Sequence, residues 1–174
     1  TRISGISIKG QTQIIFVDTP GIFKSPKRRL ERAMVDAAWK GVSGTDMTAL
    51  LVDAQAGINP QVRHIITGLK GQGIKAVLVL NKVDKAPRTS VLERSRELNA
   101  LGAFDETFMI SALKGDGVED LHTYRADKMS KGPWLYPEDQ ISDVSLRFLA
   151  SEITREKIFL NLHQELPYAL AVET

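Results

Sequence analysis

Four short, mostly apolar runs, separated by segments with helical patterning, limit the folds available to this chain. The runs are residues 14–17, 47–52, 76–80 and 107–110, and each is followed directly by Asp, Asn or Ser. Runs of this length are typical of strands buried on both faces, as in parallel sheets covered by helices. Apolar residues spaced three or four apart predict helices over 30–40, 59–70 and 90–101. This alternation favours right-handed crossovers and a largely parallel sheet, so we predict an α/β fold with helices on both faces.

Local signals refine this outline at both ends of the chain. Alternating isoleucines before Lys9-Gly10-Gln11 predict a hairpin that ends in the 14–17 strand. Asn59 followed by Pro60 predicts a helix start, because Asn caps helices and proline is tolerated in the first turn. A polar helix is expected over 117–131, and Ser142-Asp143 predicts the cap of a long helix reaching about residue 162. A short strand is expected over 168–173.

Composition excludes several classes of protein. The 174 residues contain no cysteine, which rules out disulfides and thiolate metal sites and is typical of a reducing compartment. No apolar run approaches the roughly 18 residues that cross a bilayer, so we expect a soluble, cytoplasmic protein. The formal net charge is only +2, so any nucleic-acid surface must be a local patch.

The first run delivers an aspartate into a turn, Asp18-Thr19-Pro20-Gly21. Ligands of open α/β sheets bind beyond the carboxyl ends of strands, which is where Asp18 would stand. Gly21 allows a close backbone approach. Alone, this pattern is better explained by a strand followed by an ordinary Pro-Gly turn. The basic loop at 22–29 is either a solvated loop or one that changes shape with the ligand and presents its cations to RNA.

The third run ends in Asn81-Lys82-Val83-Asp84, whose chemistry suits guanine. An aspartate accepts hydrogen bonds from both the ring N–H and the amino group of guanine, an arrangement that adenine does not offer. Each such bond is worth about 1.5 to 3 kcal/mol. Lys82 can lay its aliphatic stem along the purine, and Asn81 can tie this loop to a neighbouring one. The alternative is a polar loop with helix-capping residues.

The fourth run ends in Ser111-Ala112-Leu113. Adjacent parallel strands place the loops at their carboxyl ends side by side, so this loop should lie beside the one that contains Asp84. Its backbone amides would then reach the carbonyl oxygen of guanine.

With these three motifs in this order, the chain resembles the translation-factor-class P-loop GTPases. Residues 147–157 and 165–168 narrow the resemblance to the Era family of bacterial GTPases, over essentially the whole chain. The resemblance implies GTP hydrolysis with GTP/GDP and Mg²⁺ as cofactors. It also implies binding to 16S rRNA, assistance in 30S subunit assembly, and partial peripheral association of an otherwise monomeric cytoplasmic protein with the inner membrane.

Family positions carry over residue by residue. Asp18 would hold Mg²⁺ through water, and Gly21 would contact the γ-phosphate. Ile22 stands where many GTPases place a water-orienting glutamine, so the catalytic group is unassigned. No RNA-binding residue is assigned. The nucleotide-binding residues implied are Asp18, Thr19, Pro20, Gly21, Ile22, Asn81, Lys82, Val83, Asp84, Ser111, Ala112 and Leu113.

Two family elements are missing from this sequence. It contains no Gly-x-x-x-x-Gly-Lys-Ser/Thr, the loop that cradles phosphates. We therefore expect an internal portion of a longer chain that lacks the first strand and binds GTP weakly or not at all. The expected divisions are a GTPase domain at 1–132, a linker at 133–141, and the start of a KH-like domain at 142–174. The KH Gly-x-x-Gly loop is also absent, so RNA binding rests on resemblance. The alternative function is a non-enzymatic RNA-binding or ribosome-docking module with an incomplete nucleotide site.

Overall fold

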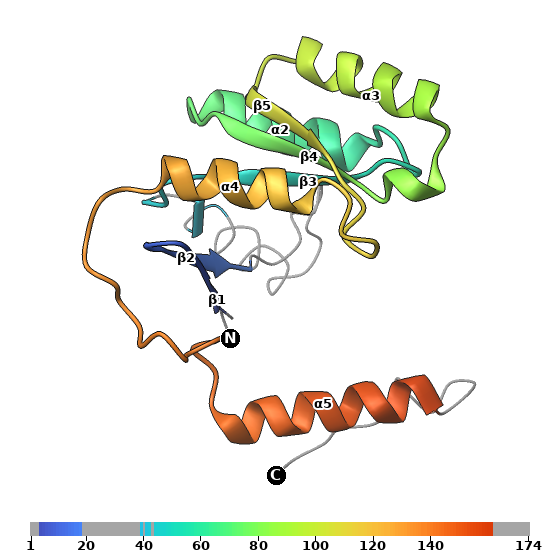
Figure 1. The fold of residues 1–174 in the computed structure, drawn as a ribbon. Helices are drawn as coiled ribbons and strands as arrows, with labels where there is room; N and C mark the ends of the chain where they lie inside the picture. Colours follow the sequence, from blue (N-terminus) through green and yellow to red (C-terminus); the bar gives the residue numbers. More distant parts are fainter. Residues whose placement is uncertain (1–3, 19–38, 40, 43, 162–174) are drawn as a thin grey trace, which may run out of the picture. The chain divides into compact units, whose positions relative to one another are not determined.

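The computed structural model describes residues 4–18, 39, 41–42 and 44–161 (Figure 1). The elements in chain order are β1 (Ser4–Lys9), β2 (Thr12–Val17), β3 (Ala49–Asp53), α2 (Pro60–Gly71), β4 (Ala76–Asn81), the 3₁₀ turn η1 (Val83–Lys85), α3 (Arg88–Ala100), β5 (Phe104–Met109), α4 (Val118–Lys128) and α5 (Leu146–Asn161). The helix predicted over 30–40 and the strand over 168–173 fall largely or wholly outside the described residues.

The chain separates into two compact units. One comprises the described residues of Ile8–Ile14 and Thr19–Leu135, and the other those of Thr1–Ser7, Ile15–Asp18 and Tyr136–Thr174. Each unit is considered by itself below. The boundaries predicted at 132 and 142 stay a prediction.

The larger unit is built on a three-stranded sheet in the order β3-β4-β5, with all pairs parallel. Asp53 at the end of β3 is in register with Asn81 at the end of β4. Leu80 is likewise in register with Met109 of β5. The parallel α/β class predicted from the alternating pattern is therefore confirmed.

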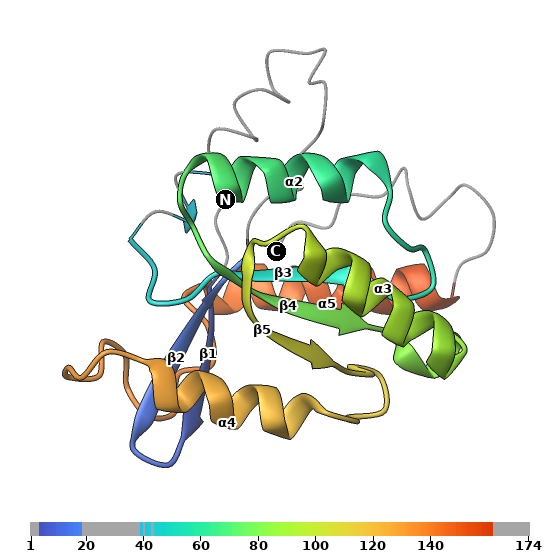
Figure 2. The ribbon, with the colours of Figure 1, turned by 90° about the horizontal axis from the view of Figure 1, so that it is seen from above.

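Both faces of this sheet are covered by helices (Figures 1 and 2). Leu78 and Leu80 of β4 belong to a core that includes residues of α2 and α3. Val77 and Val79 point to the opposite face and share a second core with Leu121 of α4. Because alternate strand residues face opposite sides, every residue of β4 from 76 to 80 is buried. Each fully buried leucine or valine contributes about 1.5 to 3 kcal/mol relative to exposure.

The helix starts show where local signals suffice and where they do not. The side chain of Asn59 accepts a hydrogen bond from the Val62 amide at 2.9 Å, which confirms the predicted cap of α2. The cap predicted for the long helix at Ser142-Asp143 was wrong. The helix starts at Leu146, and Ser145 Oγ accepts from the Phe148 amide at 3.2 Å.

The hairpin contributes to both units. Its turn contains Gly10, whose φ of 57° is easily reached only by glycine. In the larger unit, Trp134 Nε1 donates to the Gln11 carbonyl at 2.9 Å. In the smaller unit, the Ile6 amide donates to the Ile141 carbonyl at 2.9 Å.

Among the described residues, no helix combines the length and apolarity needed to cross a membrane.

Candidate functional site

The loops that follow β3, β4 and β5 meet at the carboxyl edge of the parallel sheet. The Ala54 amide, just after β3, donates to the Asn81 carbonyl at 2.8 Å. The Val83 amide, just after β4, donates to the Ile110 carbonyl at 3.2 Å. The predicted adjacency of the loop containing Asp84 and the loop containing Ser111 is therefore confirmed.

Asn81 ties these two loops together, as its sequence position suggested. Its Oδ1 accepts hydrogen bonds from the Lys82 amide at 2.7 Å and from the Ala112 amide at 3.0 Å. One side-chain oxygen thus fixes the backbone on both sides of the site. Backbone amides of the 111–113 loop were predicted to reach the guanine carbonyl. The Ala112 amide is engaged by Asn81 in this structure, and a contact of this loop with guanine stays a prediction.

Asp84 is paired with the hydroxyl of Ser111, which is fully buried. This hydrogen bond lowers the pKa of the Asp84 carboxyl, and the positive charges of Lys114 and Lys85 lower it further. Ser111 is itself held in a closed loop, since its amide donates to the Asp116 carbonyl at 3.0 Å. The result is an ionised, partly exposed carboxylate at neutral pH with acceptor capacity beyond its bond to Ser111.

Lys82 adopts a left-handed conformation with φ 64° and ψ 35°. It is the one non-glycine among the described residues with a positive φ. Its ammonium pairs with Asp53 Oδ2 at 2.7 Å. Sequence reasoning missed Asp53. The available signal was an acidic residue at the end of the strand next to the one that carries Asn81.

The remaining predicted site residues differ in what the structure shows of them. Asp18 is exposed and follows β2 directly, but it belongs to the smaller unit. The convergence of Asp18 with Asn81 and Ser111 thus stays a prediction. Thr19, Pro20, Gly21 and Ile22 lie outside the described residues. Val83 is half-buried in η1, and Leu113 has 84% of its surface exposed.

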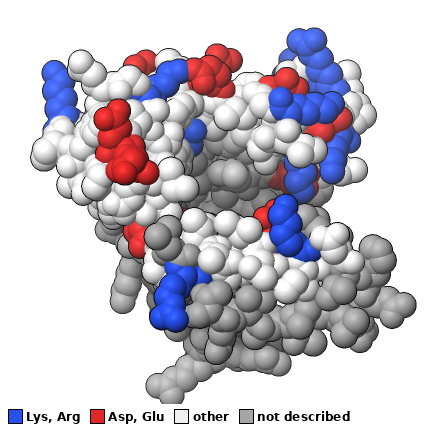
Figure 3. All heavy atoms as spheres, turned by 60° about the horizontal axis from the view of Figure 1, so that its bottom comes forward, with Lys and Arg blue, Asp and Glu red and all other residues white. Residues whose placement is uncertain are grey.

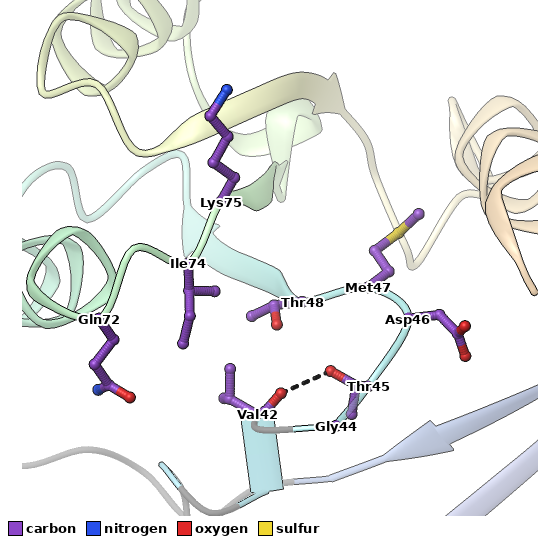
Figure 4. Close-up of a pocket in the computed structure, with 9 residues that line it drawn as sticks. All are labelled: Val42, Gly44, Thr45, Asp46, Met47, Thr48, Gln72, Ile74 and Lys75. Carbon is purple, nitrogen blue, oxygen red and sulfur yellow. Dashed lines mark hydrogen bonds between the residues drawn. The ribbon is translucent and has the colours of Figure 1, made fainter.

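A separate cavity of about 370 Å³ opens at the amino edge of the same sheet (Figure 4). Several of its polar groups already have partners. Thr45 Oγ1 donates to the Val42 carbonyl at 2.9 Å, and Lys75 pairs with Asp105 at 3.0 Å.

On the face of the molecule seen in Figure 3, the described basic and acidic side chains are interspersed.

The family model of the elongation factor Tu GTP binding domain matches residues 2–131. The chain belongs to this family. A curated relative, "GTPase Era" from Rhizobium meliloti (strain 1021), is 55% identical over 99% of this chain and 55% of its own length. "GTPase Era" from Brucella suis biovar 1 (strain 1330) is 52% identical over the same shares. The chain therefore spans about half the length of the curated relatives it matches.

Two solved structures are similar in fold and sequence. One is Era in complex with MgGDPNP and nucleotides 1506–1542 of 16S ribosomal RNA, with a TM-score of 0.84 and 34% identity over 99% of this chain and 59% of that one. The other is an Aquifex aeolicus Era variant bound to GDP.AlF4-, with a TM-score of 0.80 and 34% identity over 95% of this chain and 57% of that one. The predicted resemblance to Era is confirmed.

Proposed function

We propose that this chain is part of a protein that binds and hydrolyses GTP and assists 30S ribosomal subunit assembly by binding 16S rRNA. One observation supports the guanine specificity above all. The Asp84 carboxylate lies beside Ser111, in a loop that the Asn81 side chain binds to the neighbouring loop through the Ala112 amide at 3.0 Å. Membership of the GTP-binding family and the likeness to Era support the rest.

In this proposal Asp84 accepts the ring N–H and the exocyclic amino group of guanine. Both bonds require the ionised carboxylate as acceptor, which is the form of an aspartate at neutral pH. An adenine base would leave the carboxylate without those donors, so discrimination should be strong. Lys82, Val83, Ala112 and Leu113 would surround the base.

The phosphate end of the site rests on the loop that begins at Asp18. Mg²⁺ prefers carboxylate and water oxygens and keeps several of its waters, and the exposed Asp18 carboxylate fits that chemistry. When bound, the ion supplies charge neutralisation for the phosphates. Asp18 would orient the ion through water, while Thr19, Pro20, Gly21 and Ile22 would line the phosphate side.

The smaller unit would carry the RNA-binding role, as the start of a KH-like domain. A relative solved with a 16S rRNA segment supports this assignment. We also propose a cytoplasmic protein, monomeric in solution, with partial peripheral association with the inner membrane. A nucleotide-dependent change in the 18–29 loop would be relayed to the RNA-binding part.

The test is the replacement Asp84→Asn in the full-length gene product. An asparagine presents an amide donor that matches the carbonyl of xanthine, so the variant should lose GTP affinity by at least tenfold and gain affinity for xanthosine nucleotides. Competition against a fluorescent GDP measures both effects. Asp127→Asn, an exposed carboxylate on α4, is the matched control. Unchanged selectivity in the Asp84 variant would remove the guanine assignment.

The same preparations test the RNA role. Binding of a labelled 16S rRNA 3′ segment should be tighter with a non-hydrolysable GTP analogue than with GDP. Asp84→Asn should shift that nucleotide response to xanthosine analogues. RNA binding that ignores the nucleotide would instead favour a non-enzymatic docking module.

A further inference from the structure

Asp53 lies outside the guanine-recognition motifs, yet both of its carboxylate oxygens are engaged at the edge of the site. Oδ1 accepts hydrogen bonds from the Gln55 amide at 2.8 Å and the Ala56 amide at 3.3 Å. Oδ2 accepts from the Lys82 ammonium at 2.7 Å. The carboxylate is thus fixed by its own turn and presents its second oxygen to Lys82. Asp53 is less exposed than its partner, with 31% of its side-chain surface accessible against 51% for Lys82.

The backbone of Lys82 is restrained as well. A non-glycine residue in the left-handed region is uncommon and costs conformational energy, so neighbouring contacts must hold it there. The Asn81 side chain binds the Lys82 amide and the Lys85 amide donates to the Lys82 carbonyl at 3.0 Å, while Asp53 binds the ammonium. The register of β3 and β4 sets Asp53 opposite Asn81, so the contacts made by these two residues originate at one edge of the sheet.

A lysine with a free ammonium samples many rotamers, and ordering it on ligand binding costs entropy. An ion pair at the tip of the side chain fixes the four-carbon stem before the ligand arrives. The stem is then ready to lie against a purine while the charge stays satisfied. The pKa of the Asp53 carboxyl is lowered chiefly by its hydrogen bond with Lys82.

We propose that Asp53 is a positioning residue for guanine-nucleotide binding, acting through Lys82 to hold its aliphatic stem in the base-stacking position. This inference rests on the proposed function. Asp53 should therefore affect the affinity for guanine nucleotides and their residence time on the protein, whereas Asp84 determines which base is bound.

Two substitutions remove the pair from opposite sides. Asp53→Asn keeps an oxygen that can accept from the Gln55 and Ala56 amides, so the turn survives while the charge on Lys82 loses its partner. Lys82→Met keeps an apolar stem without the ammonium. Because the pair is partly exposed, each change made in the full-length gene product should speed release of a fluorescent GDP by about two- to fivefold. Asp105→Asn, which breaks the exposed pair with Lys75, is the matched control and should leave release unchanged.

The double variant separates positioning from a general structural effect. If Asp53 acts through the ammonium, Asp53→Asn should have no further effect in the Lys82→Met background. An equal effect in both backgrounds would assign Asp53 a structural role and overturn the proposal. Unchanged GDP release from the Asp53→Asn variant would also overturn the proposal. Slower release would overturn it as well, because it would mean that Lys82 must leave Asp53 in order to bind the nucleotide. In each of these cases the unmodified protein still binds GDP, whereas no binding at all would mean that the proposed function itself fails.

Discussion

Ser111 adjusts the charge of its neighbour through a single buried hydroxyl. Its hydrogen bond lowers the pKa of Asp84, so the ionised form persists to lower pH than in a free aspartate. The folded-state pKa lies below the unfolded value of about 3.9, so the stabilisation is present above that value and lost as the pH falls through the folded pKa. Nucleotide binding that needs the carboxylate should follow the same acid limb.

Ser111→Ala should therefore raise the pKa of Asp84 toward its ordinary value. The acid limb of GDP affinity should move to higher pH, with little change in affinity at pH 7. Fluorescent GDP titrations of the full-length gene product between pH 3.5 and 7 measure the shift. Ser130→Ala is the control, since Ser130 hydrogen bonds the Asp46 carboxylate far from these loops in sequence. An acid limb that stays in place would show that Ser111 does not set the Asp84 charge.

Site residues could be predicted from the sequence where the ligand is recognised by a fixed set of side chains within a short motif. Asn81 and Asp84 were identified for that reason, and a tie from Asn81 to a neighbouring loop was anticipated, though not its partner Ala112. Asp53 was missed because its partner is 29 residues away and an aspartate after a strand is common. The left-handed backbone of Lys82 was also unforeseen, since such positions favour glycine or asparagine.

At the scale of elements, α2 contains two glycines in contrasting environments. A Cβ added at Gly68 would lie 2.5 Å from Trp39 Cζ2, whereas one at Gly71 would meet nothing within 4 Å. Alanine gains up to about 1 kcal/mol of helix propensity over glycine at either position. Displacing a packed tryptophan costs about 1 to 3 kcal/mol, which outweighs that gain.

We therefore expect opposite signs from the two alanine substitutions. Gly71→Ala should raise the free energy of unfolding by a few tenths to about 1 kcal/mol, and Gly68→Ala should lower it by about 1 to 2 kcal/mol. Urea unfolding followed by circular dichroism measures both. Equal stabilisation by the two substitutions would mean that Trp39 does not pack on Gly68 in solution.

The start of a helix could be predicted where the sequence offered a single clear capping signal. Asn59-Pro60 gave one start for α2, and the structure uses it. The prediction placed the cap of α5 at Ser142-Asp143, whereas the helix starts at Leu146 and Ser145 caps it. Within α3, Val91 is buried and Leu92 is 42% exposed, because adjacent residues of a helix cannot both face the sheet.

At the scale of the whole molecule, the alternating pattern predicted the parallel sheet but not the contacts made by the segment after α4. The hydrogen bond from Trp134 to Gln11 joins residues 123 apart, and the Leu135 amide donates to Gln13 Oε1 at 3.0 Å. Hydrophobic periodicity does not predict such hydrogen bonds, because the segment after α4 is irregular and its path back to the hairpin is not set by a repeating pattern.

These two bonds hold the 134–135 segment on the hairpin, and their loss should make the nearby chain easier to cleave. Trp134→Phe removes the Nε1 donor and keeps an aromatic ring, at a cost of about 1 kcal/mol, which corresponds to about fivefold more local opening. Trypsin should then cut after the exposed Lys131 about five times faster under native conditions, as measured by mass spectrometry. Leu135→Ala is the control, because its side chain is 73% exposed and its bond to Gln13 uses the backbone amide. Equal cleavage of the Trp134 variant and the unmodified chain would mean that the hydrogen bond to Gln11 does not restrain this segment.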